Sequence, residues 1–176
     1  MFQSRPSALA LAVLLSLSFW PGPAPAQTPQ TLGTAGKWSA YTFLEEGNTV
    51  CYMSSEPDKQ EGNYKVRDKA FALVTHRPAL NSRDVVSFIA GYPLKPDLDV
   101  TLVIDGRQRF LLFPSAETAW ARDEKTDRAI VEAMIKGTTM VVNGVSARGT
   151  KTVDTFSLAG FTQTYRTISR ACGVTD

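Results

Sequence analysis

The sequence is poor in the residues that carry most metal and enzyme chemistry. Its 176 residues include one histidine, His76, and two cysteines, Cys51 and Cys172. A zinc site takes three or four His, Cys or carboxylate ligands, so this set indicates no zinc site. No Gly-x-Ser-x-Gly elbow and no Walker or Rossmann glycine motif occurs. The sequence therefore predicts no catalytic residue, no metal ligand and no cofactor. Paired carboxylates for glycoside chemistry stay open, because their spacing is set by the fold.

Two further features are missing, an excess of charge and a long apolar run. The net charge is +2, and acidic and basic residues are interspersed. Such a chain has no general attraction for nucleic acid or acidic membranes. The longest apolar run, residues 8–20, is interrupted by Ser16 and Ser18. A spanning helix needs about 20 apolar residues, so we expect no transmembrane segment. Because the chain is nearly neutral, we also expect no nucleic-acid partner.

The N-terminus has the three parts of a secretory signal. Arg5 precedes the apolar run, and Ala24-Pro25-Ala26 offers small residues for cleavage after Ala26. The sequence thus predicts a signal peptide over residues 1–26 and a periplasmic or secreted protein.

Export changes the interpretation of the two cysteines. In an oxidising compartment a single pair is normally bridged, and two free thiols are the alternative. A Cys51–Cys172 disulfide closes a loop of about 120 residues, which restricts the unfolded chain by about 4 to 5 kcal/mol.

The body of the chain is rich in short β patterns. Residues 27–36 are small and polar, which predicts a flexible leader. Residues 37–176 are predicted to form a single β-rich domain. Turn signals at residues 45–48 and at Asp105-Gly106 predict hairpins. Residues 56–63 are predicted to form an exposed loop. Alternating residues predict strands near 38–44, 48–54, 70–75, 84–90, 99–104, 109–113 and 138–142.

Two segments have helical spacing. Residues 126–136 carry an apolar stripe, and residues 160–171 place Phe161, Tyr165, Ile168 and Cys172 on one face. We therefore expect a mainly β, antiparallel sandwich-like domain with two short α-helices packed on it. The disulfide would join the last helix to the strand that carries Cys51.

The last hairpin has two candidate turns. Arg148-Gly149 is favoured because it gives two longer arms and lets Val153, Phe156 and Leu158 reach a core, and Asn143-Gly144 is then a bulge. The competing reading puts the turn at Asn143-Gly144.

Four residues are candidates for contact with a partner. Arg148, Lys151 and Asp154 surround the last hairpin, where flanking charges also suit an exposed turn. Trp120 lies between small residues and suits either a core position or an interface. His76 lies near a predicted strand end and is expected to be a surface or strand-end histidine. Tyr92 is expected at a strand-ending turn.

A longer pattern indicates a family. The run from Gly144 to Phe161 resembles the C-terminal signature of the invasion-associated locus B family. Shorter matches accompany it at Trp38, Cys51-Tyr52, Arg77-Pro78, Gly91-Tyr92, Ala119-Trp120, Met134 with Gly137, and Ala171-Cys172. The resemblance implies an exported bacterial protein with a β-rich fold. The family's namesake is associated with entry into host cells, and it has more cysteines than this chain.

These observations predict a non-enzymatic envelope protein that binds a protein, glycan or surface component. The alternative is a small-molecule or lipid carrier with a cavity lined by Phe88, Phe110 and Met134. A hydrolase ranks third, and a cleft with convergent carboxylates would support it. The sequence leaves the partner and the oligomeric state open.

Overall fold

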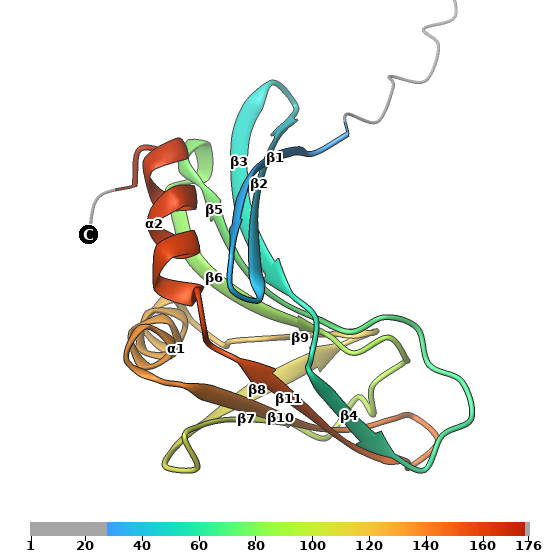
Figure 1. Cartoon of the computed structure of the whole chain (residues 1–176). Coiled ribbons are helices and arrows are strands. Elements are labelled where there is room, and N and C mark those ends of the chain that lie inside the picture. The colour runs from blue at the N-terminus through green and yellow to red at the C-terminus, as the bar shows by residue number, and fades with distance from the viewer. Residues whose placement is uncertain (1–27, 175–176) are drawn as a thin grey trace, which may run out of the picture.

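The structure, a computed structural model, describes residues 28–174. The predicted signal peptide and its cleavage site lie outside the described residues. Eleven strands form one antiparallel sheet in the order β1-β2-β3-β5-β6-β9-β8-β7-β10-β11-β4 (Figure 1). The strands are β1 Gln30–Ala35, β2 Trp38–Glu45, β3 Asn48–Ser55, β4 Lys59–Gly62, β5 Phe71–Arg77, β6 Ser82–Ile89, β7 Val100–Ile104, β8 Gln108–Ser115, β9 Thr118–Trp120, β10 Thr139–Val145 and β11 Lys151–Ser157.

The sheet divides into two halves at β8. Residues 108–112 of this strand pair with β7, and residues 113–115 pair with β9. The inner faces of the two halves share one core, since Phe88 on β6 meets Phe156 on β11 edge-to-face with ring centroids 6.2 Å apart. The predicted mainly β, sandwich-like class is confirmed.

Two helices cover the same side of the sheet (Figure 1). α1 Glu124–Lys136 begins after Asp123, whose carboxylate accepts a hydrogen bond from the Thr126 amide at 2.7 Å. α2 Phe161–Ala171 buries Phe161, Tyr165 and Ile168, the face that its spacing predicts. The Phe161 ring lies 4.9 Å from that of Trp38 on β2. A 3₁₀ turn, Pro78–Leu80, joins β5 to β6.

The predicted disulfide is present. Cys51 on β3 is bonded to Cys172, which directly follows α2, and their Cα atoms are 5.9 Å apart. Cys51 is fully buried. The bond therefore joins the last helix to an early strand, as the sequence predicts.

Three local expectations need correction. Residues 30–35, assigned to a flexible leader, form β1 and pair with β2. Residues 59–62, assigned to an exposed loop, form β4 and pair with β11. Asn143 and Gly144 pair in regular register with β11 and make no bulge. Both added strands lie at the edges of the sheet and expose most of their side chains, so neither has the apolar alternation that reveals a strand.

The last hairpin turns where the sequence predicts, and of the three residues predicted to reach the core, Phe156 and Leu158 are buried. The Gly149 amide donates to the Ser146 carbonyl at 2.8 Å, and Gly149 has φ +87°, which glycine tolerates best. The buried side chains of β11 are Thr152, Asp154 and Phe156. Val153 has the opposite parity and is only half-buried, so the prediction that it reaches the core is wrong.

Candidate functional site: a cleft beside the last hairpin

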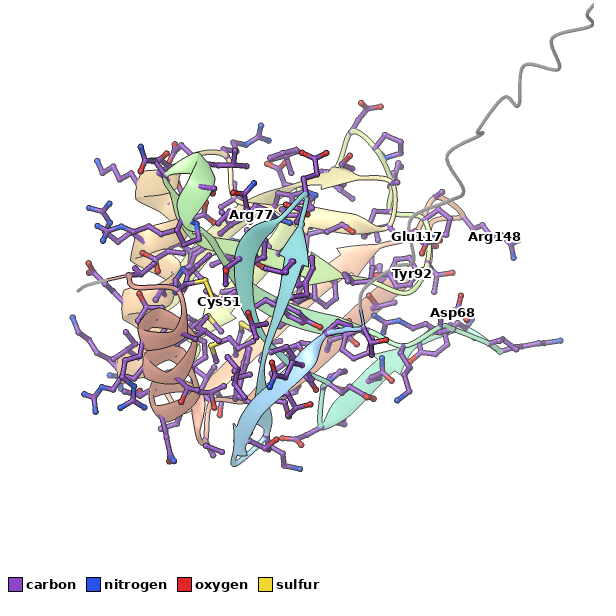
Figure 2. All side chains as sticks on the ribbon, turned by 90° about the horizontal axis from the view of Figure 1, so that it is seen from above. Cys51, Asp68, Arg77, Tyr92, Glu117 and Arg148 are labelled. Atoms are coloured by element: carbon purple, nitrogen blue, oxygen red, sulfur yellow. A yellow bond between two sulfur atoms is a disulfide. The ribbon has the colours of Figure 1, made fainter. Side chains whose placement is uncertain are left out.

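A cleft of about 620 Å³ opens beside the turn of the last hairpin. Residues 63–68, residues 91–93, Glu117 and residues from the turn Ser146–Thr150 line it. Figure 2 shows Asp68, Tyr92, Glu117 and Arg148 at one end of the molecule, away from Cys51. Segments from four parts of the chain thus converge on one hollow.

The floor of the cleft is a buried ion pair. Arg67 donates to both carboxylate oxygens of Asp154, at 2.6 and 2.7 Å, and its Nε donates to the Ala90 carbonyl at 2.7 Å. The side chains of Arg67 and Asp154 are 3% and 0% exposed. Burial alone lowers the pKa of an arginine, but the hydrogen bonds and the charge of Asp154 outweigh it and raise the pKa of Arg67. The Arg67 guanidinium is therefore charged.

Two tyrosines hold the guanidinium from the sides. The Arg67 Cζ lies 4.9 Å from the ring centroid of Tyr92 and 5.7 Å from that of Tyr64. The Tyr92 hydroxyl shares a 2.5 Å hydrogen bond with Thr152 on β11. Burial raises the pKa of Tyr92, so this hydroxyl is neutral at physiological pH.

The backbone beneath the cleft is closely packed. Gly91 has φ +72°, and a Cβ there would overlap the Asp68 carbonyl. The Asp68 amide donates to the Gly91 carbonyl at 3.1 Å, which joins the 63–68 segment to the turn after β6. The Ala147 amide donates to the Pro93 carbonyl at 2.8 Å, which joins the hairpin turn to the same segment. These bonds fix the two walls relative to each other.

The rim carries exposed groups of mixed character. Lys65 and Arg148 are basic, and Asp68 and Glu117 are acidic; all four side chains are exposed. Val66, which also lines the cleft, has 88% of its surface exposed. An exposed apolar side chain among charges of both signs suits a protein surface better than a purely anionic ligand.

The structure separates the four predicted contact residues. Arg148 lies on the rim, and Lys151 is exposed at the start of β11 beside it. Asp154 is buried against Arg67, so the expectation that it flanks an exposed turn is wrong. Trp120 lies half-buried on β9 and is not among the residues that line the cleft.

The sequence did not single out Arg67. It lies in the charged stretch between β4 and β5, which has the composition of a solvated loop. Only the fold places this arginine under the hairpin, 87 residues away from Asp154 along the chain. A basic residue in a polar segment offers no sign of burial, since its counter-charge is distant in sequence.

His76 is the second-last residue of β5, so its expected place near a strand end is confirmed, but its side chain is buried and not at the surface. Its Nδ1 accepts a hydrogen bond from the Asp84 amide at 3.1 Å, and its Nε2 lies 3.3 Å from the Ser169 hydroxyl. Because Nδ1 is an acceptor, the neutral ring carries its proton on Nε2. Burial lowers the pKa of His76, which favours this neutral form.

This Ser-His-Asp grouping has the wrong protonation pattern for a hydrolase. A catalytic histidine presents an unprotonated Nε2 to the serine and donates from Nδ1 to the carboxylate. In this chain the Nδ1 site is occupied by a backbone donor, and Ser169 is itself buried. The Asp84 carboxylate instead accepts from the Tyr165 hydroxyl at 2.6 Å. The cluster therefore fastens α2 to β5 and β6.

The residues proposed for a carrier cavity pack in the interior. Phe88 and Met134 are buried in the common core, and Phe110 packs against it. Across residues 28–174, no three potential metal-binding side chains come together. No helix in this part of the chain has the length and apolar content needed to cross a membrane.

Comparison with known proteins finds a matching family model and similar solved structures. The family model described as invasion associated locus B protein matches residues 38–169. The crystal structure of invasion associated protein B from Bartonella henselae has 21% sequence identity and a TM-score of 0.54, covering 81% of this chain and 97% of that one. At this identity the second match shows a shared fold. No curated protein matches the chain significantly.

Proposed function

This chain belongs to the invasion associated locus B family, and we propose that it is an exported, non-enzymatic protein of the bacterial cell envelope that binds another protein at the cleft beside the last hairpin. The buried Arg67–Asp154 pair beneath an exposed rim is the observation that carries this proposal. Export is supported by the predicted signal peptide and by the disulfide.

The arrangement suits binding because the floor is ordered before a partner arrives. Arg67 has partners on three sides, so its long side chain loses little further freedom on binding. The exposed rim residues, Arg148 and Val66 among them, therefore lie above an ordered floor. A preformed hollow with an apolar projection and charges at its edge is typical of a recognition site.

Arg148 offers the cleanest test. The envelope is crosslinked in cells that carry the wild-type protein, Arg148→Glu or the control Arg166→Glu, and the tagged protein is recovered. Arg166 is exposed on α2, so the control makes the same charge change outside the cleft. We expect the control to retain the wild-type partner and Arg148→Glu to lose it. Recovery of the same partner by both variants contradicts the proposal.

Export is tested separately by mass spectrometry of the protein recovered from the envelope. The expected N-terminus is Gln27, and no thiol should react with an alkylating agent before reduction. A protein that retains residues 1–26 in the cytoplasm with two free thiols contradicts this part of the proposal.

A further inference from the structure

The sheet face opposite the helices has an unusual composition. Along the strand pairing, neighbouring residues form two rows across this face, which we call the outer rows. The first row is Ser39, Ser54, Leu73, Ser87, Trp120 and Phe113. The second row is Tyr41, Tyr52, Thr75 and Val85.

The alternation of side chains along each strand places both rows on the outer face of the sheet, away from the core. Side chains alternate between the faces of a strand, and the neighbours of these residues, such as Ala40, Phe88 and Ala119, are buried in the core. Figure 1 shows α2 on one side of β2, β3 and β5 and no helix on the other. The four rings of the rows are nevertheless only half-buried. A solvated sheet face normally carries charged side chains, and the outer rows have none.

Several of the rings are held in place. Tyr41 and Tyr52 stack with centroids 5.0 Å apart at an interplanar angle of 19°, and Phe43 meets Tyr52 edge-on at 6.0 Å. At the other end the Arg122 Cζ lies 5.9 Å from the Phe113 centroid. These contacts orient flat apolar surfaces before any ligand binds.

The charges at the border of the rows are neutralised in pairs. These ion pairs are Arg77–Glu45 at 2.9 Å, Lys37–Asp58 at 2.8 Å, Lys69–Glu56 at 2.8 Å and Arg122–Asp99 at 2.7 Å. A partner with net charge finds no unpaired counter-charge among these groups, so the surface is complementary to an uncharged ligand.

We propose that the outer rows bind an uncharged glycan chain. The C–H faces of sugar rings stack on aromatic rings, and sugar hydroxyls bond to hydroxyl side chains. The rows present both kinds of group, with Ser39, Ser54 and Thr75 as partly exposed hydroxyls, while Ser87 is buried. The first row crosses six strands, about 24 Å at the usual strand spacing, so it accommodates several sugar units. A hollow of about 310 Å³ that includes Ser39, Tyr41 and Ser54 extends the rows at one end. This site is separate from the cleft and does not depend on it.

The test uses the mature full chain and three neutral probes: chitotetraose, cellotetraose and maltotetraose. Isothermal titration calorimetry measures the affinity of every variant. In the proteins that retain Trp120, which is half-buried whereas Trp38 is fully buried, a change in tryptophan fluorescence places the bound probe at the rows. We expect saturable binding of at least one probe, weakened about tenfold by Trp120→Ala and by Tyr41→Ala. Arg148→Glu and Tyr64→Ala, both in the cleft, should leave the affinity within about twofold.

Amide chemical shifts provide a check that needs no variant. Titration of the binding probe should shift amides of β2, β3, β6 and β9 and leave residues 63–68 unchanged. The proposal is overturned if no probe binds up to about 10 mM, or if the shifts fall on the cleft. It is also overturned if the wild-type protein is a dimer that Tyr41→Ser converts to a monomer, since the face is then a contact between copies.

Discussion

Replacing Arg67 with methionine tests the buried ion pair at the base of the cleft. The change removes two hydrogen bonds to Asp154 and one to the Ala90 carbonyl, all at 2.6 to 2.7 Å, and leaves a fully buried carboxylate without a counter-charge. Breaking a buried pair in this way costs about 3 to 5 kcal/mol. For a chain of this length that corresponds to a fall in melting temperature of roughly 6 to 20 °C.

Two further variants separate pairing from burial. In Arg67→Met with Asp154→Leu both charges are gone, so we expect stability within about 2 kcal/mol of the wild type and a coupling energy of at least about 2 kcal/mol. Arg77→Met is the matched control. Its pair with Glu45 has a similar distance, 2.9 Å, but is partly exposed, so the loss should stay below about 1 kcal/mol.

Urea unfolding of the oxidised protein, with the single variant Asp154→Leu added to complete the cycle, measures all five proteins under one condition. The reasoning is refuted if Arg67→Met loses no more than Arg77→Met. It is also refuted if the losses of the two cleft variants simply add in the double variant.

Four further variants have defined outcomes. Gly149→Ala should lower stability by about 1 to 2 kcal/mol, because alanine is strained at the positive φ of this position. Gly160→Ala should lower stability clearly more, because the added Cβ would also overlap the Ala35 carbonyl. Equal losses of stability in thermal unfolding would argue against this close approach. Burial raises the pKa of Asp127 to about 6, so native Asp127 binds a proton more readily than unfolded Asp127, and its contribution to stability falls as pH rises from about 4 to 6. Asp127→Asn should therefore be more stable than the wild type at pH 7.5 and no more stable at pH 4, and an advantage that does not depend on pH would contradict this. Cys51→Ser with Cys172→Ser should lose up to about 4 to 5 kcal/mol in urea, and an unchanged midpoint would show that the crosslink restricts little.

Local signals in the sequence were enough for most of the framework. Asp105-Gly106 and Arg148-Gly149 lie at hairpin turns because few other residues tolerate the positive φ required there. The faces of both helices follow from side-chain spacing, and the disulfide pairing from having only two cysteines. These features depend on neighbours in sequence or on simple counting.

The features that sequence reasoning missed depend on distant parts of the chain. β4 has no buried residue, and its pairing with β11 exists only because the sheet bends back. Asp154 was predicted on the exposed turn because its partner, Arg67, cannot be recognised from sequence alone. His76 is buried for a similar reason, since the partners of its two ring nitrogens, the Asp84 amide on β6 and Ser169 on α2, are brought to it by the fold.

The cleft itself could not be predicted, although its parts carried weak signals. Gly91-Tyr92-Pro93 was correctly placed at a turn, with Tyr92 packed against its neighbours. Its opposite wall, residues 63–68, contains no regular element to predict. Arg148 was identified as a contact because of its position on a turn, and the structure adds the hollow beside it.

The most direct test of the cleft as a binding site is site-specific photo-crosslinking in the intact envelope. A photoreactive residue replaces Val66 on the rim or Leu80 on the 3₁₀ turn, two exposed apolar positions with 88% and 70% of their surface accessible. Figure 2 places Arg77, which leads into that turn, well away from Arg148. We expect a discrete adduct at position 66 that is lost on Arg148→Glu, and no adduct at position 80. Equal adducts at both positions, or an adduct at position 80 alone, would contradict it.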